Sequence, residues 1–259
     1  MTQIIAVANQ KGGVGKTTTS VNLAASLAVI KRRVLLVDMD PQGNATTGIG
    51  LDKHESPVLM SDVLLGEADI NDAIQVVPET TIHGLAGGPN LSIAEFEMMR
   101  MDQREYRLRS VLNSVKDNYD YIIIDCPPSL NMLTVNALVA ANGVLIPMQC
   151  EYYALEGLSA LMGSVKTIRD SANSELEIIG LLRTMYDPRN NLSRDVSNQL
   201  SQHFKDKLYN TSIPRNVRLA EAPSHGLPAL MYDKRSSGAL AYLALAAELI
   251  RKESARKAA

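Results

Sequence analysis

Short runs of apolar residues recur along the chain, and longer segments with a helical period of apolar positions lie between them. The runs are nearly all apolar and rich in β-branched residues, which is typical of strands buried on both faces of a parallel sheet; they are Ile4–Ala8, Val34–Val37, Tyr121–Ile124, Val144–Met148 and Ile178–Leu182. The segments between them predict helices over Lys16–Ile30, Tyr106–Asp117, Ser129–Ala141, Leu155–Asp170 and Ser193–Lys205, with a last helix over Ser236–Lys252. The alternation predicts an α/β fold, a doubly wound and mostly parallel sheet with helices on both faces.

One stretch of the chain follows this pattern less regularly. Residues 48–104 are rich in acidic side chains, and we expect short helices and one strand there instead of a second domain. Repeats, low-complexity tracts and linkers are absent from the sequence, so we expect a single domain over residues 1–259. We expect no helix-turn-helix domain before the first strand, and we expect the tail from about residue 254 to be frayed.

Composition agrees with one soluble domain. The chain has 259 residues, of which 46% are hydrophobic and 21% charged, and this excludes a disordered chain. Cys126 and Cys150 are too few for a disulfide framework, so we expect small buried core residues in a reducing compartment, with a metal-cluster ligand pair as the alternative. The four histidines lack the spacing of a zinc site. We see neither a signal peptide nor an apolar run long enough to span a bilayer, which predicts a cytoplasmic protein.

Charge is unevenly distributed along the chain. The formal net charge is −2, but residues 174–259 contain 13 Lys and Arg against 9 Asp and Glu. The remainder contains 13 basic against 19 acidic residues. A basic C-terminal third on an acidic body suggests a face suited to a polyanion, although ordinary charge scatter on a solvated surface would give similar counts.

A glycine-rich loop directly follows the first apolar run and leads into the first helix; it reads Lys11-Gly12-Gly13-Val14-Gly15-Lys16-Thr17. Glycines let the backbone wrap around an anion, and the helix N-terminus adds donors and a favourable dipole. Lys16 would neutralise the β- and γ-phosphates, and Thr17 would offer its hydroxyl to Mg²⁺. The context of strand, loop and helix indicates an ATP-binding P-loop, although Gln10 occupies the position of the first glycine in the standard pattern.

Lys11 is a second lysine in the same loop, and one triphosphate does not obviously need both. Its side chain could point away from its own nucleotide and serve a nucleotide on a facing subunit, as an arginine finger does in trans. The alternative is a second phosphate contact in cis. The first arrangement would tie catalysis to dimerisation.

Carboxylates end two of the predicted strands. Asp38 and Asp40 are two residues apart at the end of one strand and share a face, and Asp125 ends another. Open α/β sheets place ligands at this end of the strands. One acid could help hold hydrated Mg²⁺ while another orients water, and the turn-rich residues 41–44 could rearrange with the γ-phosphate.

These motifs resemble those of the ParA/MinD superfamily of deviant Walker A ATPases, and most closely those of the small ParA (Soj) proteins that segregate chromosomes and plasmids. The resemblance extends over almost the full length. It rests on the deviant Walker A motif at Lys11–Thr18, a switch I at Asp38–Thr46, a Walker B and switch II at Asp125–Ser129, a dimer-side segment at Glu151–Gly157 and a late signature at Ile213–Gly226.

The resemblance implies a role for each matching residue. The catalytic residues would be Lys11, which contacts ATP across a sandwich dimer, Lys16, and Asp40, which positions the hydrolytic water. Thr17, Asp38 and Asp125 would support Mg²⁺. ATP would be bound by Lys11, Gly12, Gly13, Val14, Gly15, Lys16, Thr17 and Thr18, with Thr184–Asp187, Pro214 and Arg215 near adenine. Arg189 and Arg218 would bind DNA that is not read by sequence, in agreement with the basic C-terminal third.

The function implied is that of an ATPase, weak on its own, that partitions DNA. An ATP-bound homodimer would bind double-stranded DNA on the nucleoid without sequence specificity, and a ParB-type centromere-binding protein would stimulate hydrolysis and release. The alternative within the superfamily is a MinD-like membrane switch or an ATPase that positions other cargo, such as chemosensory arrays or carboxysomes. The Ala-rich C-terminus lacks aromatic residues and argues against stable membrane association. A nitrogenase-reductase-like iron–sulfur ATPase would need differently placed cysteines.

Overall fold

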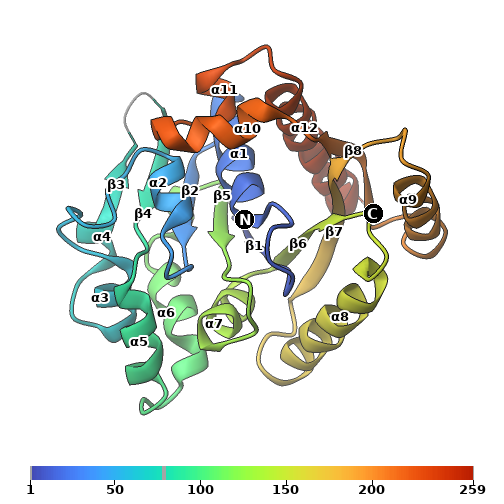
Figure 1. Ribbon diagram of the computed structural model, residues 1–259. Coiled ribbons are helices and arrows are strands. Elements are labelled where there is room, and N and C mark those ends of the chain that lie inside the picture. The colour runs from blue at the N-terminus through green and yellow to red at the C-terminus, as the bar shows by residue number, and fades with distance from the viewer. Residues whose placement is uncertain (1, 78–79, 259) are drawn as a thin grey trace.

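The computed structural model describes residues 2–77 and 80–258, and within them the chain forms one sheet of eight strands in the order β3-β4-β2-β5-β1-β6-β7-β8 (Figure 1). β3 runs antiparallel to β4, and all other neighbours are parallel. The predicted fold class is therefore confirmed. The strands are β1 (Gln3–Val7), β2 (Val34–Asp38), β3 (Ile74–Val76), β4 (Ile82–Leu85), β5 (Tyr121–Asp125), β6 (Gly143–Gln149), β7 (Glu177–Tyr186) and β8 (Leu208–Pro214).

Helices cover both faces of the sheet, as Figure 1 shows. One layer contains α1 (Lys16–Val29), α2 (Asn44–Gly48), α10 (Val217–Glu221), η3 (Ala222–His225), α11 (Ala229–Tyr232) and α12 (Ser237–Ala258). The other contains α3 (Met60–Leu65), α4 (Ile70–Ala73), α5 (Asn90–Met98), α6 (Arg107–Asn113), α7 (Met132–Ala140), α8 (Ala154–Ser171) and α9 (Asn191–His203), with the 3₁₀ turns η1 (Arg104–Tyr106) and η2 (Lys116–Asn118).

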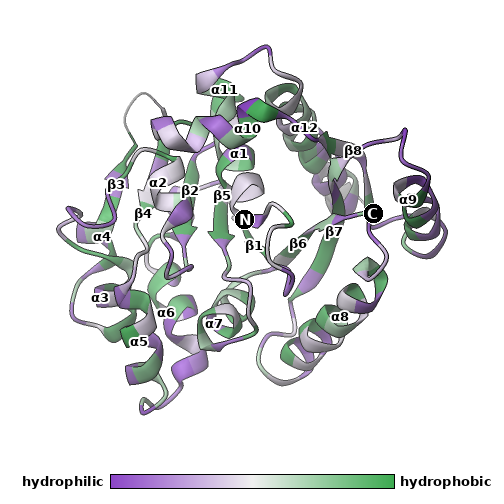
Figure 2. Cartoon of the chain, in the orientation of Figure 1, coloured by the Kyte–Doolittle hydropathy of each residue, from purple (hydrophilic) through white to green (hydrophobic). Residues whose placement is uncertain are grey.

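The strands divide the hydrophobic core into two parts because successive side chains of a strand point to opposite faces. In β5, Ile122 and Ile124 belong to the core cluster that contains residues of α3 to α9, whereas Tyr121 and Ile123 belong to the cluster that contains residues of α1 and α12. Every residue of β2 and β5 is buried, as expected of strands covered on both sides. Figure 2 shows these central strands in the hydrophobic colour, with α9 at the outside largely hydrophilic.

The strand order brings three loops together at the carboxyl ends of the central strands. β5 lies between β1 and β2, and its last residue, Asp125, is level with Val7 of β1 and with Asp38 of β2. The glycine-rich loop after β1 therefore meets the segments that follow β2 and β5. This adjacency is the structural basis of the site described below.

The structure corrects the expectations for two regions of strand. Residues 48–104 contain two strands, β3 and β4, where one was expected. β8 was not predicted, because Asn210, Thr211 and Ser212 interrupt its apolar pattern. It is an edge strand, and Glu248 of α12 accepts hydrogen bonds from the backbone N–H groups of Asn210 (2.8 Å) and Thr211 (2.9 Å), which satisfies its outer edge.

Two helices also depart clearly from their predicted boundaries. The helix expected from Ser129 begins at Met132, where the Asn131 side chain caps it by accepting from the N–H of Thr134 at 3.1 Å. The segment Tyr106–Asp117 is helical only over Arg107–Asn113 and then continues as the turn η2.

The tail expected to be frayed from about residue 254 is helical through Ala258, and Ala259 lies outside the described residues. Two contacts hold this end of α12 on the sheet. The Tyr121 hydroxyl donates to Glu253, and the Arg256 guanidinium reaches the carbonyl oxygen of Ile179 at 3.5 Å.

Candidate nucleotide-binding site

The glycine-rich loop forms an open cradle at the start of α1. A Cβ atom added to Gly12 or Gly13 would meet nothing within 4 Å, so both residues face free space. Gly13 (φ 72°) and Gly15 (φ 85°) adopt left-handed conformations that other residues rarely take. The space in front of these glycines is where a phosphate group would lie, and any side chain there would intrude on it.

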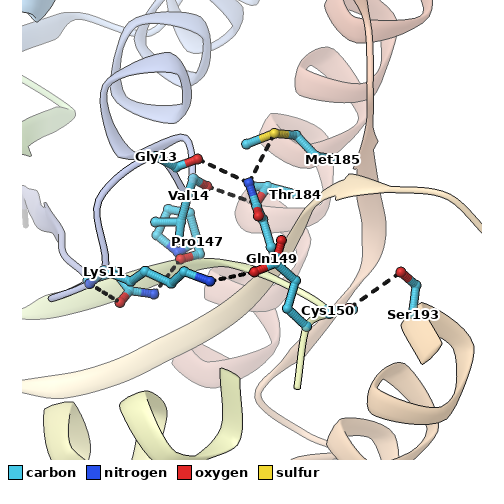
Figure 3. Close-up of polar contacts among 11 residues, drawn as sticks. Lys11, Gly13, Val14, Pro147, Gln149, Cys150, Thr184, Met185 and Ser193 are labelled. Carbon is cyan, nitrogen blue, oxygen red and sulfur yellow. Dashed lines mark hydrogen bonds and ion pairs between the residues drawn. The ribbon is translucent and has the colours of Figure 1, made fainter. Parts of the chain in front are cut away.

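The ends of β6 and β7 hold the outer side of the cradle (Figure 3). The Gln149 amide donates to the carbonyl oxygen of Gly13 (3.1 Å), and the Thr184 hydroxyl donates to that of Val14 (2.8 Å). In a trans peptide the carbonyl and the following N–H point in opposite directions. With these two carbonyls turned outward, the N–H groups of Val14 and Gly15 point into the cradle, where an anion can accept from them.

Lys16 closes the inner side of the cradle. Its side chain is almost fully buried, and its Nζ donates to the carbonyl oxygen of Lys11 at 3.1 Å, so it curls back over the loop. Burial lowers the pKa of Lys16, while the nearby Asp125 carboxyl acts in the opposite direction. An incoming phosphate would replace the carbonyl as the partner of the ammonium group.

Lys11 points elsewhere. Its Nζ forms an ion pair with Glu151, in the segment after β6, and both side chains are 49% exposed. Figure 3 shows the Lys11 side chain extending toward the strand end that carries Gln149. Lys11 is therefore not committed to its own cradle. Asn9 supports the loop entrance by accepting from the Lys11 N–H (3.0 Å) and donating to Pro147 (2.8 Å).

Three carboxylates lie beside the cradle, as the sequence predicted. Asp125 accepts from the Thr17 hydroxyl and from the Ser20 hydroxyl, both at 2.8 Å, which places it directly below the start of α1. Asp38 is level with it on the adjacent strand. Both carboxyl groups are buried away from solvent, and this burial is the largest cause of their raised pKa values. The pKa of Asp125 is raised to about 8 and that of Asp38 to about 6. A divalent cation here would offset the cost of keeping these acids ionised.

The residues present fit Mg²⁺ held in part by a substrate. No group of three or more His, Cys, Asp and Glu side chains suited to a metal occurs among the described residues. Mg²⁺ commonly binds through one or two protein ligands and substrate phosphates and keeps several waters. Thr17 and Asp125 are placed for that arrangement. Asp38 is engaged by donors of the following segment, and a direct contact between it and the metal stays a prediction.

An apolar cavity of about 260 Å³ adjoins the cradle, and Gly15 forms part of its wall. Four residues expected near adenine line the cavity, namely Thr184, Met185, Pro214 and Arg215, together with Thr18 of the glycine-rich loop. Asp187 lies in a neighbouring groove instead. Ile213, Asn216, Leu219 and Ala220 of the late signature complete the lining, with Tyr242, which the sequence did not single out. Tyr242 is a core residue of α12, and the apolar pattern of this helix does not reveal that one of its core residues lies beside the cavity.

The two arginines proposed for DNA contact lie on separate elements. Arg189 follows β7, is 88% exposed, and pairs with Asp187 at 2.9 Å. Arg218 on α10 is half-exposed and pairs with Glu221 (2.7 Å) and Asp233 (3.4 Å). Exposed ion pairs contribute little to stability, so either guanidinium can exchange its carboxylate for a phosphate at low cost.

Other residues of interest are structural. Arg183 of the basic third donates to Ser197 and to the carbonyl oxygens of Tyr209 and Asn210, which makes it part of the β7–β8 packing. Cys126 and Cys150 are buried free thiols, and burial raises the pKa of both, in agreement with the core role expected of them. His225 stacks on Tyr232.

Comparison with known proteins gives consistent relatives over the whole chain. A protein family described as an AAA domain matches residues 2–178. The sporulation initiation inhibitor protein Soj of Bacillus subtilis is 53% identical over 249 residues, 96% of this chain and 98% of Soj. The chromosome partitioning protein ParA of Caulobacter vibrioides is 48% identical over 258 residues, 99% and 97% of the two chains.

A solved structure with the same fold comes from Mycobacterium smegmatis. It is described as cobyrinic acid a,c-diamide synthase with a bound ATP analog and magnesium. The two proteins are 36% identical with a TM-score of 0.86, and the match covers 98% of this chain and 96% of the other. Strand order and helical layers are thus those of a nucleotide-binding protein.

Proposed function

The chain belongs to the ParA/MinD superfamily, close to the Soj and ParA partitioning ATPases, and from that premise we propose that Mg²⁺ and ATP at the glycine-rich loop join two copies of it into a sandwich dimer. The dimer binds double-stranded DNA without sequence specificity on the nucleoid. ATP hydrolysis, stimulated by a ParB-type centromere-binding protein, releases the dimer from the DNA. The observation that carries this proposal is the open cradle at Gly12 and Gly13 with Lys16 and Asp125 at its edge.

The cradle accounts for triphosphate binding. The inward N–H groups of Val14 and Gly15 and the ammonium group of Lys16 neutralise phosphate oxygens, and the apolar cavity beside Gly15 holds the base. When bound by Thr17 with Asp125 behind it, Mg²⁺ supplies positive charge to the β- and γ-phosphates. Asp40, almost buried at the end of β2, orients the attacking water.

The position of Lys11 supports a dimer. Its side chain leaves the cradle and ends in a half-exposed ion pair that costs little to break. A second copy facing the cradle would present its own Lys11 to this nucleotide, and this lysine would contribute charge to the transition state as arginine fingers do. Hydrolysis then removes the group that both copies share, and the dimer separates.

DNA binding follows from exposed cations that do not read bases. Arg189 and Arg218 lie in the basic C-terminal third, and we expect them to contact phosphates in the dimer. Such binding falls steeply with salt. We expect the ATP-bound dimer to act on the nucleoid, in the cytoplasm.

A MinD-like membrane switch is the alternative within the superfamily. In this chain the apolar residues Tyr242, Leu245 and Leu249 of α12 are buried in the core. Among residues 2–77 and 80–258, no helix has the length and apolar content needed to cross a bilayer. Co-sedimentation with liposomes in the presence of ATP, without any DNA binding, would favour the membrane alternative.

A titration of DNA binding tests the proposal. Binding is measured with ATP, with ADP and without nucleotide, each over a salt series, on duplexes of unrelated sequence. We expect binding only with ATP, with equal affinity for each sequence and a steep loss as salt rises. Equal binding in all three nucleotide states would refute the switch.

A further inference from the structure

Asp38 connects both ends of the segment that follows β2. One carboxylate oxygen accepts from the backbone N–H of Asp40 at 3.1 Å. The other accepts from the backbone N–H of Thr46 at 2.8 Å and from its hydroxyl at 2.7 Å. A single buried side chain therefore closes residues 40–46 into a loop whose two ends are held together.

At Thr46 the donor and the acceptor of each hydrogen bond can be assigned. The Thr46 side chain is 1% exposed, and its hydroxyl has one proton to donate. The Asp38 oxygen at 2.7 Å takes that proton in preference to the Gly87 carbonyl oxygen at 3.3 Å. The hydroxyl oxygen in turn accepts from the Gly87 N–H at 2.9 Å. Thr46 thus links the Asp38 carboxylate to the backbone that follows β4.

Gly87 provides a rigid support for the same contact. A Cβ on Gly87 would lie 2.4 Å from the carbonyl oxygen of Asp38, so the two backbones touch directly. A Cβ on Gly43, inside the loop, would lie 3.0 Å from the Gly87 carbonyl oxygen. The loop is therefore packed on the backbone after β4 at its middle and connected to it at its end through Thr46.

We propose that Thr46 is a positioning residue for ATP hydrolysis: its hydroxyl fixes the Asp38 carboxylate, and through the Asp40 N–H that carboxylate fixes the backbone of Asp40. The nucleotide contacts lie on the glycine-rich loop, in front of β1, and do not involve Thr46. Loss of the hydroxyl should therefore slow the chemical step and leave ATP binding intact. This inference rests on the proposed ATPase function.

Three variants of nearly equal shape test the role. Thr46→Val keeps the branched side chain and loses both hydroxyl contacts, whereas Thr46→Ser keeps the hydroxyl. Thr47→Val makes the same chemical change at the next, exposed residue of α2, whose hydroxyl donates to the Gly43 carbonyl oxygen at 3.2 Å. Single-turnover hydrolysis with protein in excess gives the rate constant, and a fluorescent ATP analogue gives Kd.

We expect Thr46→Val to lower the hydrolysis rate constant by about ten- to one-hundred-fold, the range for a lost hydrogen bond to a charged group. Its Kd should stay within about threefold of wild type, and Thr46→Ser and Thr47→Val should hydrolyse at near the wild-type rate. A purely structural role would weaken ATP binding and hydrolysis together. If Thr46→Val does not fold, Thr46→Cys, a weak donor of similar size, gives the same comparison.

Besides a parallel loss of ATP binding and hydrolysis, two results would overturn the inference. One is an unchanged rate constant in folded Thr46→Val, and the other is an equal loss in Thr46→Ser. Either would leave the ATPase proposal standing, because wild type still hydrolyses ATP. A wild-type protein that does not hydrolyse ATP at all would instead refute the proposed function, and the role of Thr46 with it.

Discussion

Replacing Lys11 by Ala separates the two roles that its position allows. In the structure the Lys11 ammonium pairs with Glu151, and both side chains are half-exposed. If Lys11 serves a facing subunit, it must leave this ion pair and bind a phosphate of the partner's nucleotide. If it serves its own nucleotide, the same exchange occurs within one chain.

The size of the effect follows from the two contacts. A hydrogen bond to a charged group contributes about 1.5–3 kcal/mol. An exposed ion pair contributes about 0.2–1 kcal/mol, which is the cost of releasing Lys11 from Glu151. The difference is about 0.5–3 kcal/mol per subunit. A symmetric dimer has two such contacts, so Lys11→Ala should weaken dimerisation by about 1–6 kcal/mol, or about fivefold to 10⁴-fold in the dimer dissociation constant.

Sedimentation with Mg²⁺ and a non-cleavable ATP analogue measures the dimer, and nucleotide titration of dilute protein measures binding to the monomer. We expect Lys11→Ala to lose the dimer and to keep nucleotide affinity. Lys166→Ala, an exposed lysine of α8, should change neither, and Lys16→Ala should lose nucleotide binding. A Lys11→Ala protein that dimerises like wild type would refute the contact in trans. A loss of affinity in the monomer would establish the contact in cis.

Three further changes test other parts of the site. Asp40→Ala should bind ATP, dimerise and stay on DNA without turnover; a normal rate of phosphate release would show that Asp40 does not position the water. Arg218→Glu should weaken DNA binding at least about tenfold at moderate salt and keep ATP-dependent dimerisation, while Arg251→Glu, an exposed arginine of α12, serves as the matched control in a filter-binding assay. Asp125→Asn should raise the melting temperature of the nucleotide-free protein more at pH 8 than at pH 5. The pKa of Asp125 is about 8 in the folded protein against 3.8 ordinarily, so its stabilising protonated form is lost as the pH rises through about 8. A difference in melting temperature that does not change with pH would contradict this reasoning.

Most of the sheet could be predicted from the sequence because its central strands carry a local signal. A strand covered on both faces is nearly all apolar over its buried part, and β1, β2, β5, β6 and β7 each contain such an apolar run. The cradle could be predicted for a similar reason. Its glycines, lysines and threonine are consecutive in the chain, and the strand before them and the helix after them are visible in the same short window.

The partners of those residues could not be predicted in this way. Gln149 contacts a carbonyl 136 positions earlier in the chain, and Thr184 contacts one 170 positions earlier. Neither residue is unusual in its own neighbourhood. β8 was missed because an edge strand can contain polar residues when a side chain such as Glu248 satisfies its N–H groups from another element.

By itself the sequence therefore determined the five central strands, the phosphate loop and the positions of the three carboxylates along the chain, since each is specified by neighbouring residues. Only the tertiary structure decided that Lys11 pairs with Glu151, that Tyr242 lines the cavity, and that Thr46 holds Asp38 against the backbone of Gly87. Each of these contacts joins residues on different elements, and their distances depend on strand order and helix packing. A pattern along the chain does not contain that information, because many arrangements in space are compatible with the same local pattern.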